Sequence, residues 1–171
     1  LGSTGMLGSA LLFELSRNNK VQIFATYRDE KIKYLLEKKI QNKRNKVKFI
    51  KLDILKISDL KLKKLISKID VIINCVGLIK QKINSLKNDR EALKLNSLLP
   101  LRLNNLRRKS QKIYQIATDC VFDGARGNYK ENDKHNYQDI YGLSKSLGEI
   151  NDLNFFNIRC SIIGNEIKTS F

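Results

Sequence analysis

Short apolar segments alternate with longer amphipathic segments along most of this 171-residue chain. The apolar segments are rich in Val, Ile and Phe, which is typical of strands in a parallel sheet that is buried on both faces. We expect strands at residues 21–26, 47–52, 71–75, 113–117 and 155–163. Helices are expected before and between them, at residues 9–16, 30–40, 58–68, 88–109 and 140–151. This alternation predicts an α/β fold with a doubly wound parallel sheet in one domain over residues 1–171.

Three glycines, spaced three residues apart, stand at the start of the chain and lead into the first predicted helix. They are Gly2, Gly5 and Gly8, with Met6 and Leu7 between the last two. Glycine lets a backbone approach phosphate closely, and a helix N-terminus supplies free N–H groups, so the series predicts the pyrophosphate site of a Rossmann-type dinucleotide-binding domain. The alternative is an ordinary flexible terminus. The strand that should precede such a site is missing, and we therefore expect a fragment without its first strand.

The residue that reads the adenosine ribose is expected at the end of the second strand of such a fold. Arg28 stands there and could pair with the 2′-phosphate of NADP(H), which favours NADP(H) over NAD(H), although the adjacent Asp29 leaves NAD(H) open. At the end of the next strand, Asp53 could hydrogen-bond the adenine edge with Ile54 beside it, or Asp53 could cap a helix. One strand further, the backbone could line the cofactor's ribose and pyrophosphate at Cys75, Val76 and Gly77.

A tyrosine and a lysine four residues apart, Tyr141 and Lys145, open the last predicted helix. This spacing places the phenol and the ammonium on one helix face. A nearby cation is expected to lower the pKa of a phenol, which suits proton exchange with a carbonyl or an alcohol. Thr118, at the tip of a predicted strand, could hold the substrate oxygen. The alternative for the bare spacing is a surface helix with a packed tyrosine and a solvated lysine.

In combination, these motifs resemble the extended short-chain dehydrogenase/reductase superfamily over nearly the whole chain. The segments that carry the resemblance are GSTGMLG (2–8), NCVG (74–77), ATDCVFDG (117–124), YGLSKSLGE (141–149) and IRCSIIG (158–164). Within the superfamily, the third and fourth segments look like the dTDP-4-dehydrorhamnose reductase type. The resemblance implies hydride transfer between NAD(P)H and C4 of a nucleotide-linked keto sugar, in the biosynthesis of nucleotide sugars or cell-surface polysaccharides.

The resemblance also implies a role for each site residue. Tyr141 would be the general acid, Lys145 would bind the nicotinamide ribose and lower the Tyr141 pKa, and Thr118 would orient the carbonyl. Asn96 matches the superfamily's helix asparagine and is included among the cofactor-binding residues, although it could also be a simple polar residue of a helix. Cys120 replaces a common aromatic residue, which leaves the sugar open.

The resemblance also bears on the substrate-binding part and on dimer formation. The part that builds most of the substrate pocket is expected to be incomplete, because the chain ends at Phe171. Many members form homodimers through helices beside the Tyr141 helix, but no apolar stripe in this sequence decides that. An epimerase or dehydratase of the same superfamily, or a non-catalytic NADP-binding regulatory subunit, remains an alternative function.

Composition bears on four further possibilities: nucleic-acid binding, a metal site, disulfides and a membrane span. The net charge of +16 includes +11 from residues 31–68, but Lys outnumbers Arg 24 to 9, and the basic segment 38–51 has few interleaved aromatics. Nucleic acid is therefore a disfavoured partner. Three widely spaced cysteines and the single His135 give no metal or disulfide pattern. Without a long apolar run or a charged leader, we expect no membrane span and a cytoplasmic location.

Overall fold

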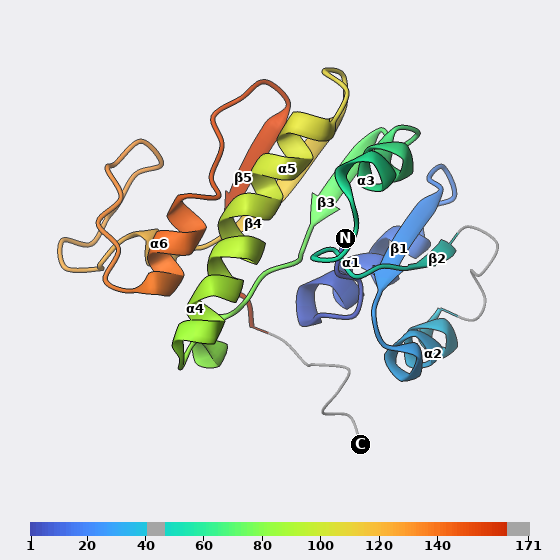
Figure 1. Cartoon of the computed structure of the whole chain (residues 1–171), viewed down its shortest axis with the longest axis horizontal. Coiled ribbons are helices and arrows are strands. Elements are labelled where there is room, and N and C mark those ends of the chain that lie inside the picture. The colour runs from blue at the N-terminus through green and yellow to red at the C-terminus, as the bar shows by residue number, and fades with distance from the viewer. Residues whose placement is uncertain (41–46, 164–171) are drawn as a thin grey trace. The chain divides into compact units, whose positions relative to one another are not determined.

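The predicted strands pair in parallel in the computed structural model, which describes residues 1–40 and 47–163 (Figure 1). They form two sheets instead of the expected one: β1 (Ile23–Tyr27) pairs with β2 (Val47–Lys51), and β3 (Val71–Asn74), β4 (Lys112–Ala117) and β5 (Phe155–Arg159) pair in that order. A doubly wound sheet places its first strand between the second and the fourth. The described residues before α1 contain no strand, so β1 and β3 have no common neighbour.

The chain divides into two compact units, and we describe each by itself. Unit 1 contains Leu1–Ile57 and consists of β1, β2, α1 (Met6–Ser16) and α2 (Glu30–Lys39). One hydrophobic cluster joins both helices to both strands, through Leu12, Ala25, Ile32, Leu36, Ile40 and Val47. The first helix begins three residues earlier than predicted, because Gly5 is its N-cap and Met6 and Leu7 are already helical. The basic residues 41–46 lie outside the part of the chain that the structure describes.

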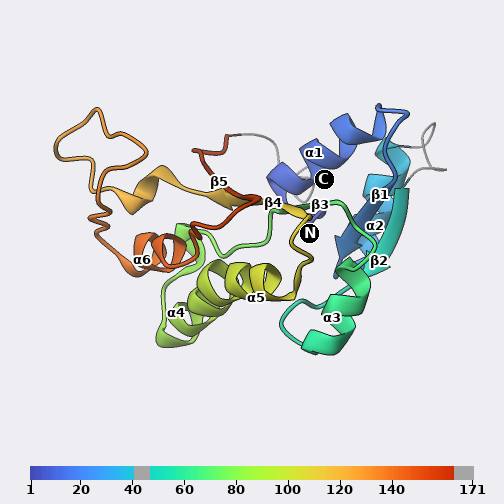
Figure 2. The ribbon, with the colours of Figure 1, turned by 90° about the horizontal axis from the view of Figure 1, so that it is seen from above.

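Unit 2 contains Ser58–Ser161 and carries the three-stranded sheet. Helices α4 (Leu86–Ala92), α5 (Leu99–Leu106) and α6 (Ile140–Ser146) lie on one face of this sheet (Figure 2). The helix predicted over residues 88–109 is interrupted by a π-helical segment, η3 (Leu93–Leu98), between α4 and α5. Helix α3 (Asp59–Ile66) packs against α5. The apolar part of the core includes Leu62, Leu103, Ile113 and Val121, each fully buried.

Two elements of unit 2 end earlier than predicted. Helix α6 ends at Ser146 instead of residue 151, because Gly148 lies directly against the backbone carbonyl of Asn96 and the chain turns there. Strand β5 ends at Arg159 instead of residue 163, and its partner strand β4 ends opposite it at Ala117. Gly164, the last residue of the expected IRCSIIG segment, lies outside the described residues.

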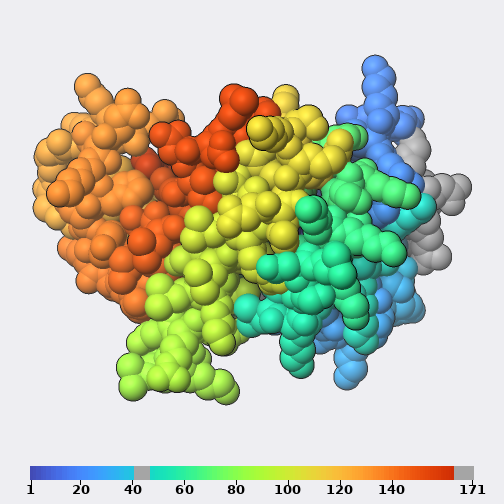
Figure 3. All heavy atoms as spheres, turned by 45° about the horizontal axis from the view of Figure 1, so that its top comes forward, coloured from blue at the N-terminus to red at the C-terminus, as the bar shows by residue number. Residues whose placement is uncertain are grey.

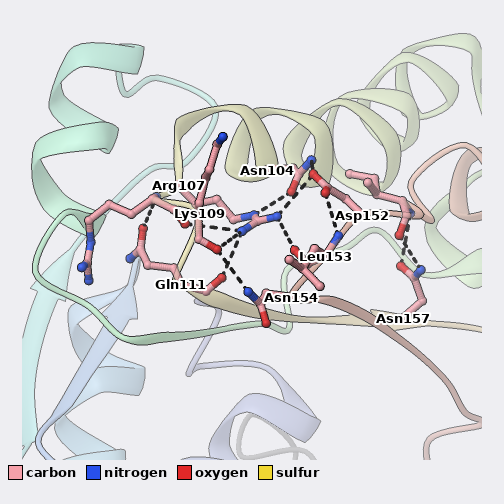
Figure 4. A network of polar contacts seen from close by, with 10 residues as sticks. Asn104, Arg107, Lys109, Gln111, Asp152, Leu153, Asn154 and Asn157 are labelled. Atoms are coloured by element: carbon pink, nitrogen blue, oxygen red, sulfur yellow. Dashed lines mark hydrogen bonds and ion pairs between the residues drawn. The ribbon is translucent and has the colours of Figure 1, made fainter.

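Polar networks fix the two ends of β5. At its start, Arg107 donates to the carbonyl oxygens of Lys109, Gln111 and Leu153 and pairs with Asp152, which ties the end of α5 to the turn before β5 (Figure 4). At its other end, Arg159 donates to both carboxylate oxygens of Glu149 at 2.9 and 2.7 Å. Arg159 also stacks on Phe122 and donates to the backbone oxygen of Glu131, both in the loop 122–139 (Figure 3, orange). This loop is irregular.

Candidate active site

The glycine series of unit 1 forms a tight turn held against the end of β1. The Gly2 N–H donates to Thr26 Oγ1 (3.0 Å), and Ser3 donates to the Thr26 carbonyl from both its N–H (3.1 Å) and its hydroxyl (2.8 Å). Gly2 has φ of 77°, a left-handed conformation that favours glycine. A Cβ on Gly8 would overlap the Gly2 carbonyl oxygen, so the turn closes only with glycine at that position. Ser3 and Thr26 were not singled out from the sequence, because their pairing is long-range.

The N-terminus of α1 is the part of this turn that can receive an anion. Its N-cap is Gly5, and no side chain caps it. The first N–H groups of a helix have no partner within the helix, and the helix dipole favours negative charge there. A close-packed glycine turn and an uncapped helix start are what a dinucleotide pyrophosphate requires. The residues present therefore fit a dinucleotide cofactor, with Gly2, Gly5, Met6, Leu7 and Gly8 positioned to hold its phosphates.

The residues after β1 and β2 lie side by side in unit 1, since the Leu52 N–H donates to the Tyr27 carbonyl (2.8 Å). Arg28 is exposed, whereas the neighbouring Asp29 is the N-cap of α2 and accepts from Lys31 N at 2.8 Å. Asp53 accepts from the Leu55 N–H (3.1 Å) and caps a turn instead of a helix, with Ile54 buried beside it. One oxygen of the Asp29 carboxylate, Oδ1, is thus engaged by its own helix, and both Arg28 and Asp29 are exposed.

In unit 2, the ends of β3 and β4 surround the ammonium group of Lys145. This side chain is 8% exposed, and its Nζ donates to the Ile116 carbonyl at 3.1 Å. Gly77 faces the same group, since a Cβ there would lie 3.1 Å from Lys145 Nζ and 2.9 Å from Asn96 Oδ1. Burial lowers the pKa of Lys145, and burial raises that of the half-buried Cys75 thiol. Val76 is connected through its N–H to Asn74 Oδ1 (3.2 Å).

Tyr141 and Thr118 meet at the start of α6. Burial raises the pKa of the Tyr141 phenol, and a hydrogen bond with the Thr118 side chain acts in the opposite direction without reversing it. The expected lowering of the Tyr141 pKa is not found: the direction is upward, because the phenol is partly buried and the nearby Cys120, Asp119 and Asp139 disfavour its anion. Thr118 is buried, and its Oγ1 also accepts from the Cys120 N–H (3.2 Å).

Asn96, in the π-helical segment, connects the loop after β3 to α6. It is 1% exposed; its Oδ1 accepts from the Leu78 N–H (2.8 Å), and its Nδ2 donates to the Leu78 carbonyl (3.0 Å) and to Ser144 Oγ (3.0 Å). The neighbouring Ser97 donates to the Ser144 carbonyl (2.7 Å). All polar atoms of the Asn96 amide are used inside the protein, so this residue holds the site residues in place.

The structure brings part of the expected site together. Unit 2 gathers seven of the residues singled out from the sequence: Cys75, Val76, Gly77, Asn96, Thr118, Tyr141 and Lys145. The residues predicted to bind phosphate belong to unit 1, as do Arg28, Asp53 and Ile54. Sequence reasoning missed Ser144, Asp139 and Lys80. Ser144 lies inside the recognised YGLSK segment, which was a usable signal, whereas Lys80 carries no local pattern.

None of the helices among the described residues is long and apolar enough to cross a membrane. Within the same residues, no group of three His, Cys, Asp or Glu side chains could hold a metal ion.

Comparison with known proteins places these residues in a family. Residues 1–151 match the model of the NAD dependent epimerase/dehydratase family. The chain belongs to this family. It is part of the extended short-chain dehydrogenase/reductase superfamily, which confirms the resemblance drawn from the motifs and the Rossmann-type fold class. Comparison with curated proteins gave no match.

Solved structures of family members show the same fold. A mutant of UDP-glucuronic acid 4-epimerase from Bacillus cereus, in complex with UDP-4-deoxy-4-fluoro-glucuronic acid and NAD, is 21% identical with a TM-score of 0.72, over 86% of this chain and 48% of that one. A hypothetical dTDP-4-dehydrorhamnose reductase from Sulfolobus tokodaii is 30% identical with a TM-score of 0.71, over 92% of this chain and 53% of that one. The present chain thus spans about half the length of these proteins.

Proposed function

We propose that this chain is the dinucleotide-binding part of an NAD(P)H-dependent reductase that acts on a nucleotide-linked 4-keto sugar. The observation that carries the proposal is the grouping of Thr118, Tyr141 and buried Lys145 at one end of the β3-β4-β5 sheet. The higher sequence identity to the dTDP-4-dehydrorhamnose reductase, compared with the 4-epimerase, supports a reductase. We place the proposed enzyme, whose substrate is a soluble sugar nucleotide, in the cytoplasm.

Each residue has a defined task in this proposal. The cofactor, when bound, supplies the hydride to the keto carbon. Tyr141 donates its phenolic proton to the keto oxygen, and this phenol is protonated at neutral pH because its pKa lies above the usual value for tyrosine. The Thr118 hydroxyl orients the same oxygen. Lys145, anchored on the Ile116 carbonyl, places a fixed cation beside the reacting groups.

The exposed Arg28 supports NADP(H) as the preferred cofactor. Its guanidinium can pair with a 2′-phosphate in the geometry that arginine favours. The adjacent carboxylate, Asp29, accepts hydrogen bonds from the backbone of α2 with its Oδ1 atom, so this oxygen already has partners. NAD(H) remains the alternative, since the family model and the 4-epimerase complex both name NAD. Fluorescence titration with NADPH and NADH decides between them, and Arg28→Leu should weaken NADPH binding while leaving NADH binding unchanged.

A steady-state assay with Tyr141→Phe tests the reaction. Measured in the whole reductase of which this chain is proposed to be a part, with dTDP-4-dehydrorhamnose and NADPH, the variant should lose about 10²-fold or more in kcat, because only the proton donor is removed. Its affinity for NADPH should stay within about threefold of the wild type, since the phenol contributes little uniform binding. Tyr34→Phe, on the exposed face of α2, is the matched control and should keep full turnover. Retained turnover in Tyr141→Phe would contradict the proposed role of Tyr141 as proton donor.

Epimerisation is the second candidate, because the Bacillus cereus 4-epimerase has a similar fold over 86% of this chain. The two reactions differ in cofactor balance. A reductase consumes one NADPH for each sugar converted, whereas an epimerase regenerates its cofactor and accumulates the C4 epimer. Product analysis by NMR together with the NADPH consumed distinguishes them.

A further inference from the structure

An ion pair connects the loop after β3 to the first residue before α6. Lys80 lies in a short 3₁₀ turn, η2 (Lys80–Lys82), and its Nζ is 2.7 Å from Asp139 Oδ2. Asp139 is the N-cap of α6, and its other oxygen, Oδ1, accepts from the Gly142 N–H at 2.8 Å. One carboxylate therefore holds the ammonium of Lys80 with one oxygen and the beginning of the Tyr141 helix with the other.

The beginning of α6 is closely packed at Gly142. A Cβ on Gly142 would lie 2.5 Å from the Cys120 carbonyl oxygen and 2.7 Å from Tyr137 Cβ. Cys120 belongs to the turn η4 (Asp119–Val121), directly after Thr118. The helix start is thus packed against this turn and against Tyr137, while the Lys80–Asp139 pair holds it through a third contact. The position of the Tyr141 phenol depends on all three.

The pair also sets the charge around the phenol. The Asp139 and Asp119 carboxylates both disfavour the Tyr141 phenolate. Burial acts to raise the pKa of Asp139, but hydrogen bonds from Gly142 N and Lys80 outweigh it, so that Asp139 stays ionised. Lys80, whose own pKa is raised by its hydrogen bond to Asp139, neutralises this carboxylate. An exposed ion pair contributes little to stability, so its effect is expected in the site and not in the fold.

We propose that Lys80 and Asp139 act as a positioning pair for Tyr141: they orient the start of its helix and balance the charge next to its phenol. This inference rests on the proposed function for Tyr141. It adds Lys80 and Asp139 to the proposed site. Both lie outside the recognised motifs, and Lys80 is distant in sequence from Tyr141. Neither residue is assigned contact with substrate or cofactor.

Four variants of the protein test the pair: Lys80→Met, Lys80→Arg, Asp139→Asn and the double variant Lys80→Met with Asp139→Asn. Lys80→Met should lower kcat by about tenfold with the NADPH KM unchanged, because misplacement of a reacting group acts on the chemical step. Lys80→Arg keeps the charge and should restore kcat to within about threefold of the wild type. Lys82→Met changes an exposed residue of the same turn and should leave kcat unchanged.

The decisive readout is the pH at which Tyr141 ionises, which needs no turnover. Ultraviolet titration of each variant, minus the same variant carrying Tyr141→Phe, isolates this phenol from the other five tyrosines. Lys80→Met leaves the Asp139 charge unbalanced and should move the ionisation to higher pH. Asp139→Asn keeps an oxygen for the Gly142 N–H but removes the anion, and should move it to lower pH. The double variant removes both charges and should lie between them.

If Lys80 and Asp139 had a structural role alone, Lys80→Met and Asp139→Asn would not shift the ionisation of Tyr141 in opposite directions. Identical titrations in all variants, or equal loss of kcat in Lys80→Met and Lys82→Met, would overturn the proposal. Failure of the proposed function gives a different result, namely no turnover of any keto sugar nucleotide by the wild type. The opposite titration shifts would still appear in that case, because they depend only on the charges beside the phenol.

Discussion

The side-chain amide of Asn96 donates to the hydroxyl of Ser144 across 3.0 Å, and both residues are fully buried. Ser144 lies on α6 between Tyr141 and Lys145, and Asn96 lies in the π-helical segment that follows α4. Because Asn96 also hydrogen-bonds both backbone groups of Leu78, one amide fixes the loop after β3 relative to α6. Short π-helical segments are frequent at functional sites, and this one turns Asn96 into the unit 2 core.

Asn96→Ala should therefore destabilise the protein more than its small change in volume suggests. The substitution removes partners from Ser144 and from both backbone groups of Leu78, and unpaired buried groups cost about 1–3 kcal/mol. Urea denaturation should show a loss of about 2 kcal/mol. Asn88→Ala, which removes exposed hydrogen bonds, is the control and should cost less than about 1 kcal/mol. Equal losses in the two variants would contradict the role of Asn96.

The sequence predicted the elements of the fold better than their ends. All five strands and the helix that carries Tyr141 and Lys145 lie within a few residues of the predicted ranges, because the alternation of apolar and amphipathic segments is a local signal. The early end of α6 depends on the contact of Gly148 with the Asn96 carbonyl, which no local pattern contains. The π-helical insertion likewise leaves the apolar spacing of the 88–109 segment almost unchanged.

In the candidate site, too, local sequence features could be predicted, whereas features that depend on distant contacts could not. Thr118, Tyr141 and Lys145 could be named from their spacing and order, but the direction of the Tyr141 pKa could not. That direction depends on how deeply the phenol is buried and on Asp119 and Asp139, which are brought close by the turn η4 and the helix cap. The Rossmann-type fold class is confirmed, but the division of the strands into two sheets could not be read from the apolar segments, because these identify strands and not their neighbours.

Lys145→Met should separate stability from activity. Burial lowers the Lys145 pKa in the folded state, so the unfolded chain binds more protons between that lowered pKa and the usual value of 10.5. The free energy of unfolding of the wild type should then rise with pH across this window, relative to Lys145→Met, which has no such group. Urea denaturation at several pH values, from about 8 to about 10, measures this slope.

The same variant should be at least as stable as the wild type at neutral pH, because it removes a buried charge. The Ile116 carbonyl keeps a partner, since Gln115 Nε2 also donates to it at 3.0 Å. Turnover should nevertheless fall by about 10²-fold or more if the ammonium acts in catalysis. Lys112→Met, exposed on β4, is the control and should change neither the pH slope nor the turnover. Parallel pH dependences of the wild type and Lys145→Met would show that the ammonium is solvated.

Two alanine substitutions in the glycine turn should separate its packing from its proposed binding of phosphate. A Cβ on Gly8 would overlap the Gly2 carbonyl, and Gly2 cannot retreat without breaking the hydrogen bonds that hold Gly2 and Ser3 to Thr26. Gly8→Ala should therefore reduce both thermal stability and NADPH affinity, the latter by about tenfold or more, because the helix start is displaced.

Gly5→Ala places its Cβ at 3.6 Å from the Gly2 carbonyl, an ordinary contact, and should keep the wild-type melting temperature. If this turn binds the pyrophosphate, the added methyl group still obstructs the close approach of the phosphates, so NADPH affinity should fall without a loss of stability. Thermal denaturation and fluorescence titration on the same samples measure the two effects. Unchanged affinity in both variants would mean that the turn is only a structural connection between Thr26 and α1, and the cofactor would have to be held elsewhere.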